Sequence, residues 1–343
     1  MKAKNRFLAA ILIFCMTVLT GCIQQSDPTE EKLSDNTYAF ISKNVQNSYM
    51  QKLYQGFNAA CREAGVSAIY KAPVSYMPQE QADIINELIE AGVKGIAVAA
   101  NDENALTEVL QKAMDSGIKV VSVDSAVNAS ARQVHIQQAD PDKIGRTLIS
   151  SAYDAIGGQG GIAILSSTEH ATNQNLWIEY MKKEVEENPE KYSSAPIIEV
   201  AYGDDDITKS TSETQRLLQN PEIKAIVVPT SVGIMAAGEV IRNSDSAVKL
   251  IGLGMPSQMS EFIENGTCQK MYLWNPVDTG YLAAYALNAL NGGQITGAEG
   301  DIFTAGSLGE KTVTVDTTGG TEIMLGDLVE FNKDNISEWK DAF

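Results

Sequence analysis

Two kinds of apolar pattern alternate along most of the chain. Short runs such as Gly95–Ala99 and Ile118–Val123 are apolar throughout, which is typical of strands covered on both faces of a sheet. Longer stretches such as Gln79–Ala91 carry apolar residues three or four positions apart, which predicts amphipathic helices. Glycines that directly follow such stretches, Gly65 and Gly92 among them, suit left-handed helix ends. Strands and helices are therefore expected in alternation.

The alternation falls into two series joined by a short bridge at Gln133–Gln138. We expect strands at Thr37–Ile41, Val66–Tyr70, Gly95–Ala99, Ile118–Val123, Gly161–Leu165, Ile197–Ala201, Ala225–Val228, Lys249–Gly252 and Lys270–Leu273. We expect helices at Ser48–Ala64, Gln79–Ala91, Glu103–Ser116, Pro141–Ile156, Asn173–Glu186, Thr208–Leu218, Val232–Arg242, Gln258–Glu264 and Val277–Leu290. Residues 292–343 hold two short strand candidates. The pattern predicts an α/β protein with two similar, doubly wound parallel-sheet lobes.

Polar and aromatic side chains stand where the predicted strands end. In parallel sheets the ligand crevice lies at these carboxyl ends, so the residues there are the candidate ligand-binding residues. They are Lys43, Asn44, Tyr49, Asp102, Asp124, Asn173, Gln174, Trp177, Pro229, Ser231, Gly254, Trp274 and Asn275. Carboxylates and amides pair with adjacent hydroxyls, and an indole can cover the C–H face of a sugar. The set therefore predicts a sugar-binding pocket.

Some of these residues have simpler explanations. Asp102 and Ser231 can equally serve as helix caps, and Trp177 can belong to the core. Asp204–Asp206 is interpreted as a solvated loop, because no clustered ligands accompany it as a metal site requires. Asp124 ends an apolar strand and precedes no obvious helix, so capping explains it poorly. We expect its carboxylate to face an open cleft and accept hydrogen bonds from two neighbouring sugar hydroxyls.

The N-terminus has the pattern of an export signal. Lys2, Lys4 and Arg6 precede the apolar run Phe7–Leu19, which is too short to cross a bilayer as a stable helix. The run ends in Leu-Thr-Gly-Cys, the arrangement in which bacterial lipoproteins lipidate the cysteine, here Cys22. An ordinary signal peptide cleaved nearby is the alternative.

Composition excludes several functions. The formal net charge of −18 disfavours binding to nucleic acid and to anionic lipid, so a lipid anchor has to hold the protein at the membrane. Cys61 and Cys268 form no CxxC pair and are expected to be two buried thiols, although a disulfide between them is possible. His135 and His170 have no metal-ligand spacing, and no GxSxG motif or phosphate loop is present. We therefore expect neither an enzyme nor a cofactor.

Five longer stretches carry a resemblance to a known family. They are "ATNQNLW", "VVPTSVGIMAA", "GLGMPSQM", "LWNPVDTGYLAAYA" and "ITGAEGDIFTAGSLGE". On these the chain resembles the ribose-type solute-binding proteins of ATP-driven importers along nearly all of its mature length, and within them the rhamnose-binding proteins. The resemblance implies the type I periplasmic-binding-protein fold and a sugar ligand.

The same branch of the family contains receptors for a furanosyl autoinducer. Their pattern is a lysine after the first strand, an aspartate after the fourth, an Asp-Gln pair and Pro-x-Ala. The residues that match are Lys43, Asp124, Gln174 and Pro229. Asn173 replaces the aspartate and Ser231 the alanine, and rhamnose-type relatives tend to have "TNQN" at that corner, which favours a sugar. Asn275 stands where those relatives tend to carry aspartate.

The residue pattern of the N-terminus predicts a lipoprotein signal peptide (1–22) and, because residues 23–35 are polar and lack apolar periodicity, a flexible tether (23–35). The resemblance adds a mechanism and two lobes, an N-terminal lobe (36–136 plus 275–303) and a C-terminal lobe (137–274 plus 304–343). Three crossings, near Gln137, Asn275 and Thr304, let the lobes close on one ligand molecule. The closed form is then read by the membrane permease of the importer, and a separate ATPase supplies the energy.

We expect a monomer that needs no cofactor and is lipid-anchored at the extracytoplasmic face. Two alternatives remain open at this point. One is an autoinducer receptor of the same family, and the other is a sugar sensor that partners a chemoreceptor or kinase.

Substituting Cys22 tests the anchor. Cys22→Ala should abolish lipidation, because the thiol is the acylated group, and the protein should leave the membrane fraction. Detergent partitioning of cell extracts measures this. A variant that still partitions with membranes would contradict the lipoprotein interpretation.

Overall fold

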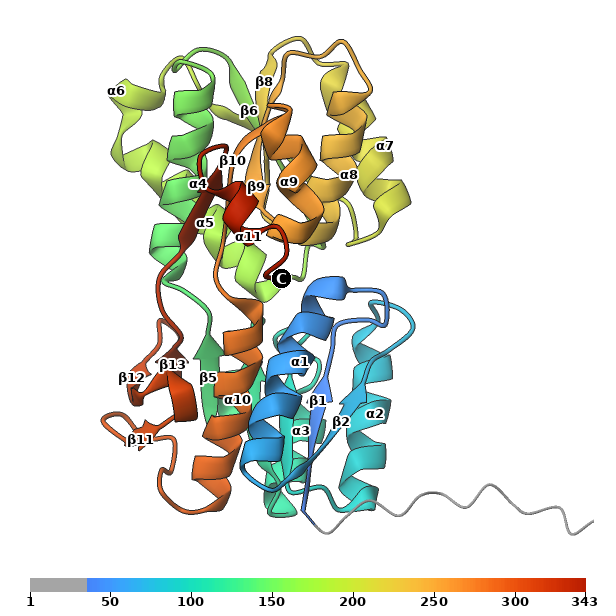
Figure 1. Cartoon of the computed structure of the whole chain (residues 1–343), viewed down its shortest axis with the longest axis vertical. Helices are drawn as coiled ribbons and strands as arrows, with labels where there is room; N and C mark the ends of the chain where they lie inside the picture. Colours follow the sequence, from blue (N-terminus) through green and yellow to red (C-terminus); the bar gives the residue numbers. More distant parts are fainter. Residues whose placement is uncertain (1–35) are drawn as a thin grey trace, which may run out of the picture. The chain divides into compact units, whose positions relative to one another are not determined.

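The computed structural model of the chain describes residues 36–343. The predicted signal peptide, Cys22 and the tether lie outside the described residues. Two mainly parallel sheets organise the chain, with strand orders β11-β12-β13-β5-β4-β3-β1-β2 and β14-β10-β9-β8-β6-β7. The order β2-β1-β3-β4-β5 of the first sheet recurs as β7-β6-β8-β9-β10 in the second, so the two lobes repeat one topology (Figure 1). The predicted two-lobed α/β fold is confirmed.

The first lobe is built from two separate segments of the chain. Its elements up to residue 137 are β1 (Thr37–Ile41), α1 (Ser48–Glu63), β2 (Ser67–Lys71), α2 (Pro78–Ala91), β3 (Gly95–Val98), α3 (Thr107–Asp115), β4 (Lys119–Val123) and β5 (Val134–Gln137). It is completed by α10 (Pro276–Asn291), β11 (Ile302–Thr304), β12 (Glu310–Val315) and β13 (Thr321–Met324).

The second lobe lies between these segments in the sequence. Its elements are α4 (Pro141–Ala155), β6 (Gly161–Ser166), α5 (Thr172–Glu187), α6 (Pro189–Tyr192), β7 (Ile197–Tyr202), α7 (Ile207–Leu218), β8 (Ile223–Val228), α8 (Ser231–Arg242), β9 (Lys249–Leu253), α9 (Pro256–Glu264) and β10 (Cys268–Leu273). The chain returns to it at the end with β14 (Val329–Asn332) and α11 (Ile336–Trp339).

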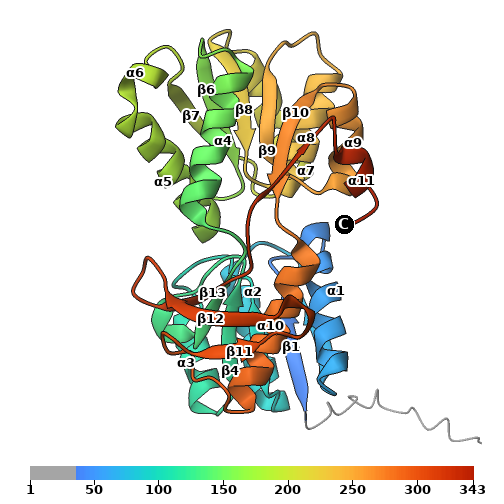
Figure 2. The ribbon, with the colours of Figure 1, turned by 60° about the vertical axis from the view of Figure 1, so that its left-hand side comes forward.

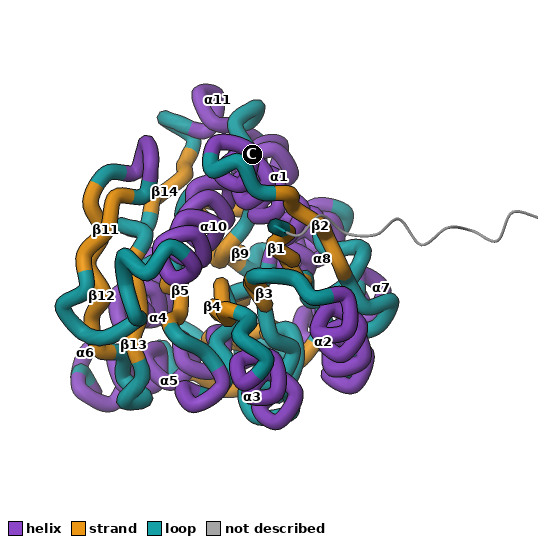
Figure 3. The backbone as a smooth tube through the Cα atoms, turned by 90° about the horizontal axis from the view of Figure 1, so that it is seen from below, coloured by secondary structure: helices purple, strands orange, loops and turns teal. Residues whose placement is uncertain are grey.

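The first sheet is covered on both faces, as its apolar runs predicted. Along β1, Tyr38 and Phe40 belong to the core shared with α1 and α10, whereas Ala39 and Ile41 belong to the core shared with α2 and α3. Seen from below, α10 and α1 lie on one side of β3 and β4, and α2 and α3 lie on the other (Figure 3). Alternate side chains of each strand therefore stabilise opposite layers.

Helices α1 and α10 pack with almost no space between their backbones. A Cβ atom added to Gly280 would lie 1.7 Å from the carbonyl oxygen of Leu53, and one added to Gly56 would lie 1.8 Å from that of Val277. Only glycine fits at these two positions. Because α10 begins directly after the chain leaves the second lobe, this contact ties the late segment to the start of the chain.

The C-terminal segment departs from the prediction. Strand β13 pairs in parallel with β5, β12 pairs with β13, and β11 pairs with β12, so residues up to Met324 extend the first sheet. The chain crosses to the second lobe between Met324 and Val329, where β14 joins β10 (Figure 2). The expected crossing near Thr304, with residues 304–343 in the second lobe, is therefore wrong.

Two features of the sequence explain this error. Strands β11 and β12 are short and mostly exposed, with Phe303 and Val313 as their buried residues, so they lack a strong apolar pattern. The stretch expected to be a bridge, Gln133–Gln138, instead contains β5, and β13 pairs with it. Because β5 was not predicted, β13 and the strands that follow it in the sheet had no predicted neighbour.

Other expectations are met within this part of the chain. Cys61 and Cys268 are free and buried, as predicted. Among residues 36–343, no helix combines the length and the apolar character that crossing a membrane requires.

Substitution at the α1–α10 contact tests the packing. Gly280→Ala forces a methyl group against the backbone of Leu53, so we expect the free energy of unfolding to fall by about 2–3 kcal/mol or more. Urea unfolding measures this. Gly326→Ala is the control: its Cβ would meet no atom within 4 Å, and stability should change by no more than about 0.5 kcal/mol. Equal stability of the two variants would contradict the close contact.

Candidate functional site

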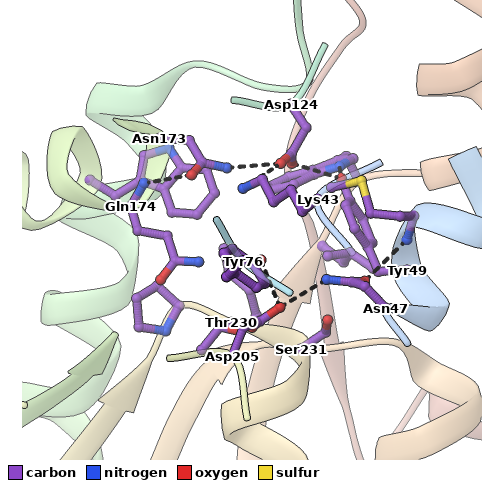
Figure 4. Close-up of a pocket in the computed structure, with 16 residues that line it drawn as sticks. Lys43, Asn47, Tyr49, Tyr76, Asp124, Asn173, Gln174, Asp205, Thr230 and Ser231 are labelled. Atoms are coloured by element: carbon purple, nitrogen blue, oxygen red, sulfur yellow. Dashed lines mark hydrogen bonds and ion pairs between the residues drawn. The ribbon is translucent and has the colours of Figure 1, made fainter. Parts of the chain in front are cut away.

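A pocket lies where the carboxyl ends of both sheets meet. The residues from the first lobe are Lys43, Asn47, Tyr49, Met50, Tyr76 and Asp124. The residues from the second lobe and its end at β10 are Asn173, Gln174, Trp177, Asp205, Pro229, Thr230, Ser231, Leu253, Leu273 and Trp274 (Figure 4).

Asp124 is the most heavily bonded group of the pocket. It follows β4 with φ of 64°, a left-handed conformation that aspartate tolerates better than most residues. Its Oδ2 lies 3.2 Å from the Lys43 ammonium and accepts from Asn173 Nδ2 at 3.1 Å. Its Oδ1 accepts from the Tyr49 hydroxyl at 3.2 Å and from Gln138 Nε2 at 3.4 Å. A carboxylate has about four acceptor positions, and protein donors occupy all of them.

This arrangement corrects the expectation for Asp124. The side chain does not face an open cleft, because only 4% of it is exposed. Its carboxylate instead orients donors: the Lys43 ammonium keeps two further N–H groups, and Asn173 is held from the opposite lobe. The geometry therefore favours Lys43 and Asn173 as the groups that present N–H bonds to a ligand.

Tyr49 links this carboxylate to the crossing segment. Its hydroxyl donates to Asp124 and accepts from the indole Nε1 of Trp274 at 2.7 Å. Burial, and secondly the charge of Asp124, raise the pKa of Tyr49 well above its usual value. The hydroxyl therefore stays protonated and acts as a donor to the carboxylate at any physiological pH.

The "TNQNLW" corner begins α5 and supplies three pocket residues. Gln174 Oε1 accepts from the hydroxyl of Ser166 and the amide of Ser167, both at 2.8 Å, and so its side chain is fixed on the end of β6. Trp177 packs against Trp274 with ring centroids 5.8 Å apart. The corner thus supplies two amide side chains and the indole of Trp177. Together with Trp274, Met50, Leu253 and Leu273, this indole forms the apolar part of the pocket lining.

Nine of the thirteen predicted residues line the pocket: Lys43, Tyr49, Asp124, Asn173, Gln174, Trp177, Pro229, Ser231 and Trp274. The other four have local structural roles. Asp102 accepts from the amides of residues 104 and 105, and Asn275 caps α10. Asn44 accepts from the amide of residue 46, and Gly254 packs against Met259. Some of the polar residues that follow strands therefore bond to nearby backbone amides and do not line the pocket.

The sequence analysis missed the polar pocket residues Asn47, Tyr76, Asp205 and Thr230. Asn47 is the N-cap of α1, and Thr230 lies between two predicted residues, so both could have been found by extending the strand-end rule. Tyr76 lies in the loop before α2, away from any strand end. Asp205 is the third residue after β7 and was interpreted as part of a solvated loop, which is wrong for this residue.

The two histidines lie outside this pocket. His170 is largely exposed, and burial, together with the charge of Arg132, lowers the pKa of His135 to about 3, so it is neutral at physiological pH. Residues 36–343 contain no group of three His, Cys, Asp or Glu side chains placed to hold a metal ion.

Comparison with known proteins supports a binding function. Residues 38–295 match the family model described as a periplasmic binding protein domain. An ABC transporter solute-binding protein from Clostridium phytofermentas, solved with bound L-rhamnose, is 40% identical, with a TM-score of 0.87 over 91% of this chain and 100% of that chain. The D-allose-binding periplasmic protein of Escherichia coli is 24% identical over 71% of this chain and 80% of its own length. LsrB from Clostridium saccharobutylicum in complex with AI-2 is 20% identical, with a TM-score of 0.81 over 88% of this chain and 99% of that chain, and shows the shared fold.

The fold and the interlobe pocket thus define an extracytoplasmic solute-binding protein, and the chain belongs to the periplasmic binding protein domain family. Within it, the relatives place the chain among the sugar-binding proteins of ABC transporters.

The Lys43–Asp124 pair gives a stability prediction. Asp124→Ala leaves a buried ammonium without its counter-charge, so we expect the free energy of unfolding without ligand to fall by about 2–4 kcal/mol. Chemical denaturation measures this. Lys43→Met combined with Asp124→Ala should recover part of the loss, since no charge is then left unpaired. An Asp124→Ala protein as stable as the parent would mean that the pair is solvated.

Proposed function

We propose that the protein is the lipid-anchored receptor of an ABC sugar importer and binds L-rhamnose or a closely related deoxysugar. The observation that carries this proposal is the mixed lining of the pocket. It contains donors and carboxylates (Lys43, Asn173, Asp205) together with apolar side chains that include Trp177 and Leu253. A deoxysugar presents both hydroxyls and a methyl group. The 40% identical protein with bound L-rhamnose supports this choice.

Closure of the lobes on the ligand is the proposed mechanism. Hydrogen bonds join residues of opposite lobes in the structure, among them Asn173 to Asp124, Asn47 and Tyr76 to Asp205, and Gln258 to Ser48 at 3.0 Å. A ligand bound between the lobes bridges the same two surfaces and adds its own hydrogen bonds to them. The closed form presents one surface to the permease, the ATPase supplies the energy, and Cys22 holds the receptor at the extracytoplasmic face.

A receptor for a furanosyl autoinducer is the second candidate. Lys43, Asp124, Gln174 and Pro229 match the autoinducer pattern and line the pocket. Asn173 argues for the sugar, because the autoinducer pattern has a carboxylate there, and in this chain the amide Nδ2 donates to Asp124. A sugar sensor acting with a chemoreceptor or kinase would use the same pocket and differ only in the partner.

Titration calorimetry of the mature domain against a panel of sugars tests the ligand. L-rhamnose should bind with micromolar or lower Kd, because a few hydrogen bonds to charged groups contribute about 1.5–3 kcal/mol each. D-ribose and D-allose should bind at least about tenfold more weakly, since their polar groups would face the apolar side chains of the pocket. Binding of AI-2 but not of L-rhamnose would favour the second candidate, and tight binding of D-allose would overturn the deoxysugar assignment.

A further inference from the structure

Asp205 forms a second carboxylate centre on the other side of the pocket from Asp124 (Figure 4). It lies in the loop between β7 and α7 with φ of 50°. Its Oδ2 accepts from Asn47 Nδ2 and from the Tyr76 hydroxyl, both at 2.9 Å, and its Oδ1 accepts from the hydroxyl of Thr230. Asn47 and Tyr76 belong to the first lobe, so this carboxylate of the second lobe joins the two lobes.

The bonds of Asp205 leave it able to bind a ligand, in contrast to Asp124. Three protein donors occupy three of its about four acceptor positions, which leaves one on Oδ1. Among the described residues, none of its donors is a lysine or arginine, whereas the neighbouring Asp204 pairs with Lys209. A carboxylate bonded only to neutral donors keeps its charge available, and a hydroxyl that donates to it forms a charge-assisted hydrogen bond.

Both first-lobe partners of Asp205 are donors, and Asn47 is held in place independently of Asp205. Asn47 caps α1 through its Oδ1, which accepts from the amide of Met50 at 3.2 Å, so its Nδ2 is turned toward Asp205. The Tyr76 hydroxyl stays protonated, because burial and the charge of Asp205 raise the pKa of Tyr76 well above its usual value. Asn47 is therefore a fixed donor and Tyr76 a permanently protonated one, and both donate to Asp205 across the two lobes.

We propose that Asp205 is the clamp of the cleft: one carboxylate oxygen accepts a sugar hydroxyl while the other holds Asn47 and Tyr76 of the opposite lobe. This inference rests on the proposed sugar-binding function. A ligand hydroxyl at Oδ1 holds the carboxylate in the orientation that presents Oδ2 to the first lobe. Binding and closure thus share one side chain, and its main effect is on how slowly the ligand leaves the closed cleft.

Substitutions that keep the local structure test the clamp. Asp205→Asn preserves the left-handed conformation, which asparagine also adopts, but removes the charge. Tyr76→Phe removes one donor, and Asn47→Asp keeps the α1 cap while placing a second carboxylate against Asp205. Asp204→Asn is the matched control, because Asp204 is about half exposed, shares the φ of 50° and does not line the pocket.

Calorimetry with L-rhamnose and stopped-flow tryptophan fluorescence give the readouts. We expect Asp205→Asn and Asn47→Asp to weaken binding by about 30- to 300-fold, mostly through faster dissociation, and Tyr76→Phe by about 3- to 10-fold. Asp204→Asn should bind like the parent. An Asp205→Asn protein within threefold of the parent in both Kd and dissociation rate overturns the clamp.

Failure of the proposed ligand is distinguishable from failure of the clamp. If the parent binds another sugar of the panel and not L-rhamnose, the ligand assignment fails, and the same variants are measured with the sugar that binds. If that sugar dissociates equally fast from the parent and from Asp205→Asn, the clamp fails as well. A parent that binds no sugar of the panel overturns both.

Discussion

The buried pair of Lys43 and Asp124 sets the geometry of the pocket. Both side chains are at least 95% removed from solvent, and a charge in such a place is tolerated only when it is paired and hydrogen-bonded. The requirement is met by Tyr49, Gln138 and Asn173, which surround the carboxylate. Each of these groups is fixed because the charge has to be satisfied, so the donors available to a ligand are already oriented before it binds.

Two carboxylates work from opposite lobes in complementary ways. Asp124 of the first lobe accepts from Asn173 of the second, and Asp205 of the second lobe accepts from Asn47 and Tyr76 of the first. Each lobe therefore provides an acceptor for donors of the other. The contacts between the lobes are thus made by residues that also line the pocket, and in the proposed mechanism they couple ligand binding to closure.

The sequence predicted the features that depend on repeated apolar patterns. Strands such as β4 are buried on both faces, so their sequences are mostly apolar and are recognised easily. Most of the pocket residues were predicted because they follow the carboxyl ends of these strands. Strand β5 was missed because its buried residues include His135 and Gln137, which interrupt the apolar run. Strands β12 and β13 were assigned to the wrong lobe, since the pairing of β13 with β5 decides their place and no local pattern records it.

Individual roles in the pocket depended on partners that the sequence does not show. Asp124 and Asp205 both lie just after strands, yet which of them keeps a free acceptor position is decided by residues 14 to 158 positions away. Asp102 is the opposite case, because its partners are the amides two and three residues further along the chain. The sequence therefore predicts which kinds of side chain stand at the strand ends. Which acceptor positions of those side chains are already bonded within the protein is seen only in the three-dimensional structure.

The first lobe gives this arrangement a rigid base next to a crossing. Helix α1 carries Asn47 at its cap and Tyr49 in its first turn, and it is fixed against α10 by the backbone contact at Gly280. Helix α10 starts two residues after Trp274, and the indole of Trp274 donates to the Tyr49 hydroxyl. The crossing is thereby bonded to the same hydroxyl that donates to Asp124. In the proposed mechanism, movement of the second lobe about this crossing acts on the buried carboxylate through Trp274 and Tyr49, which links closure to the state of the pocket.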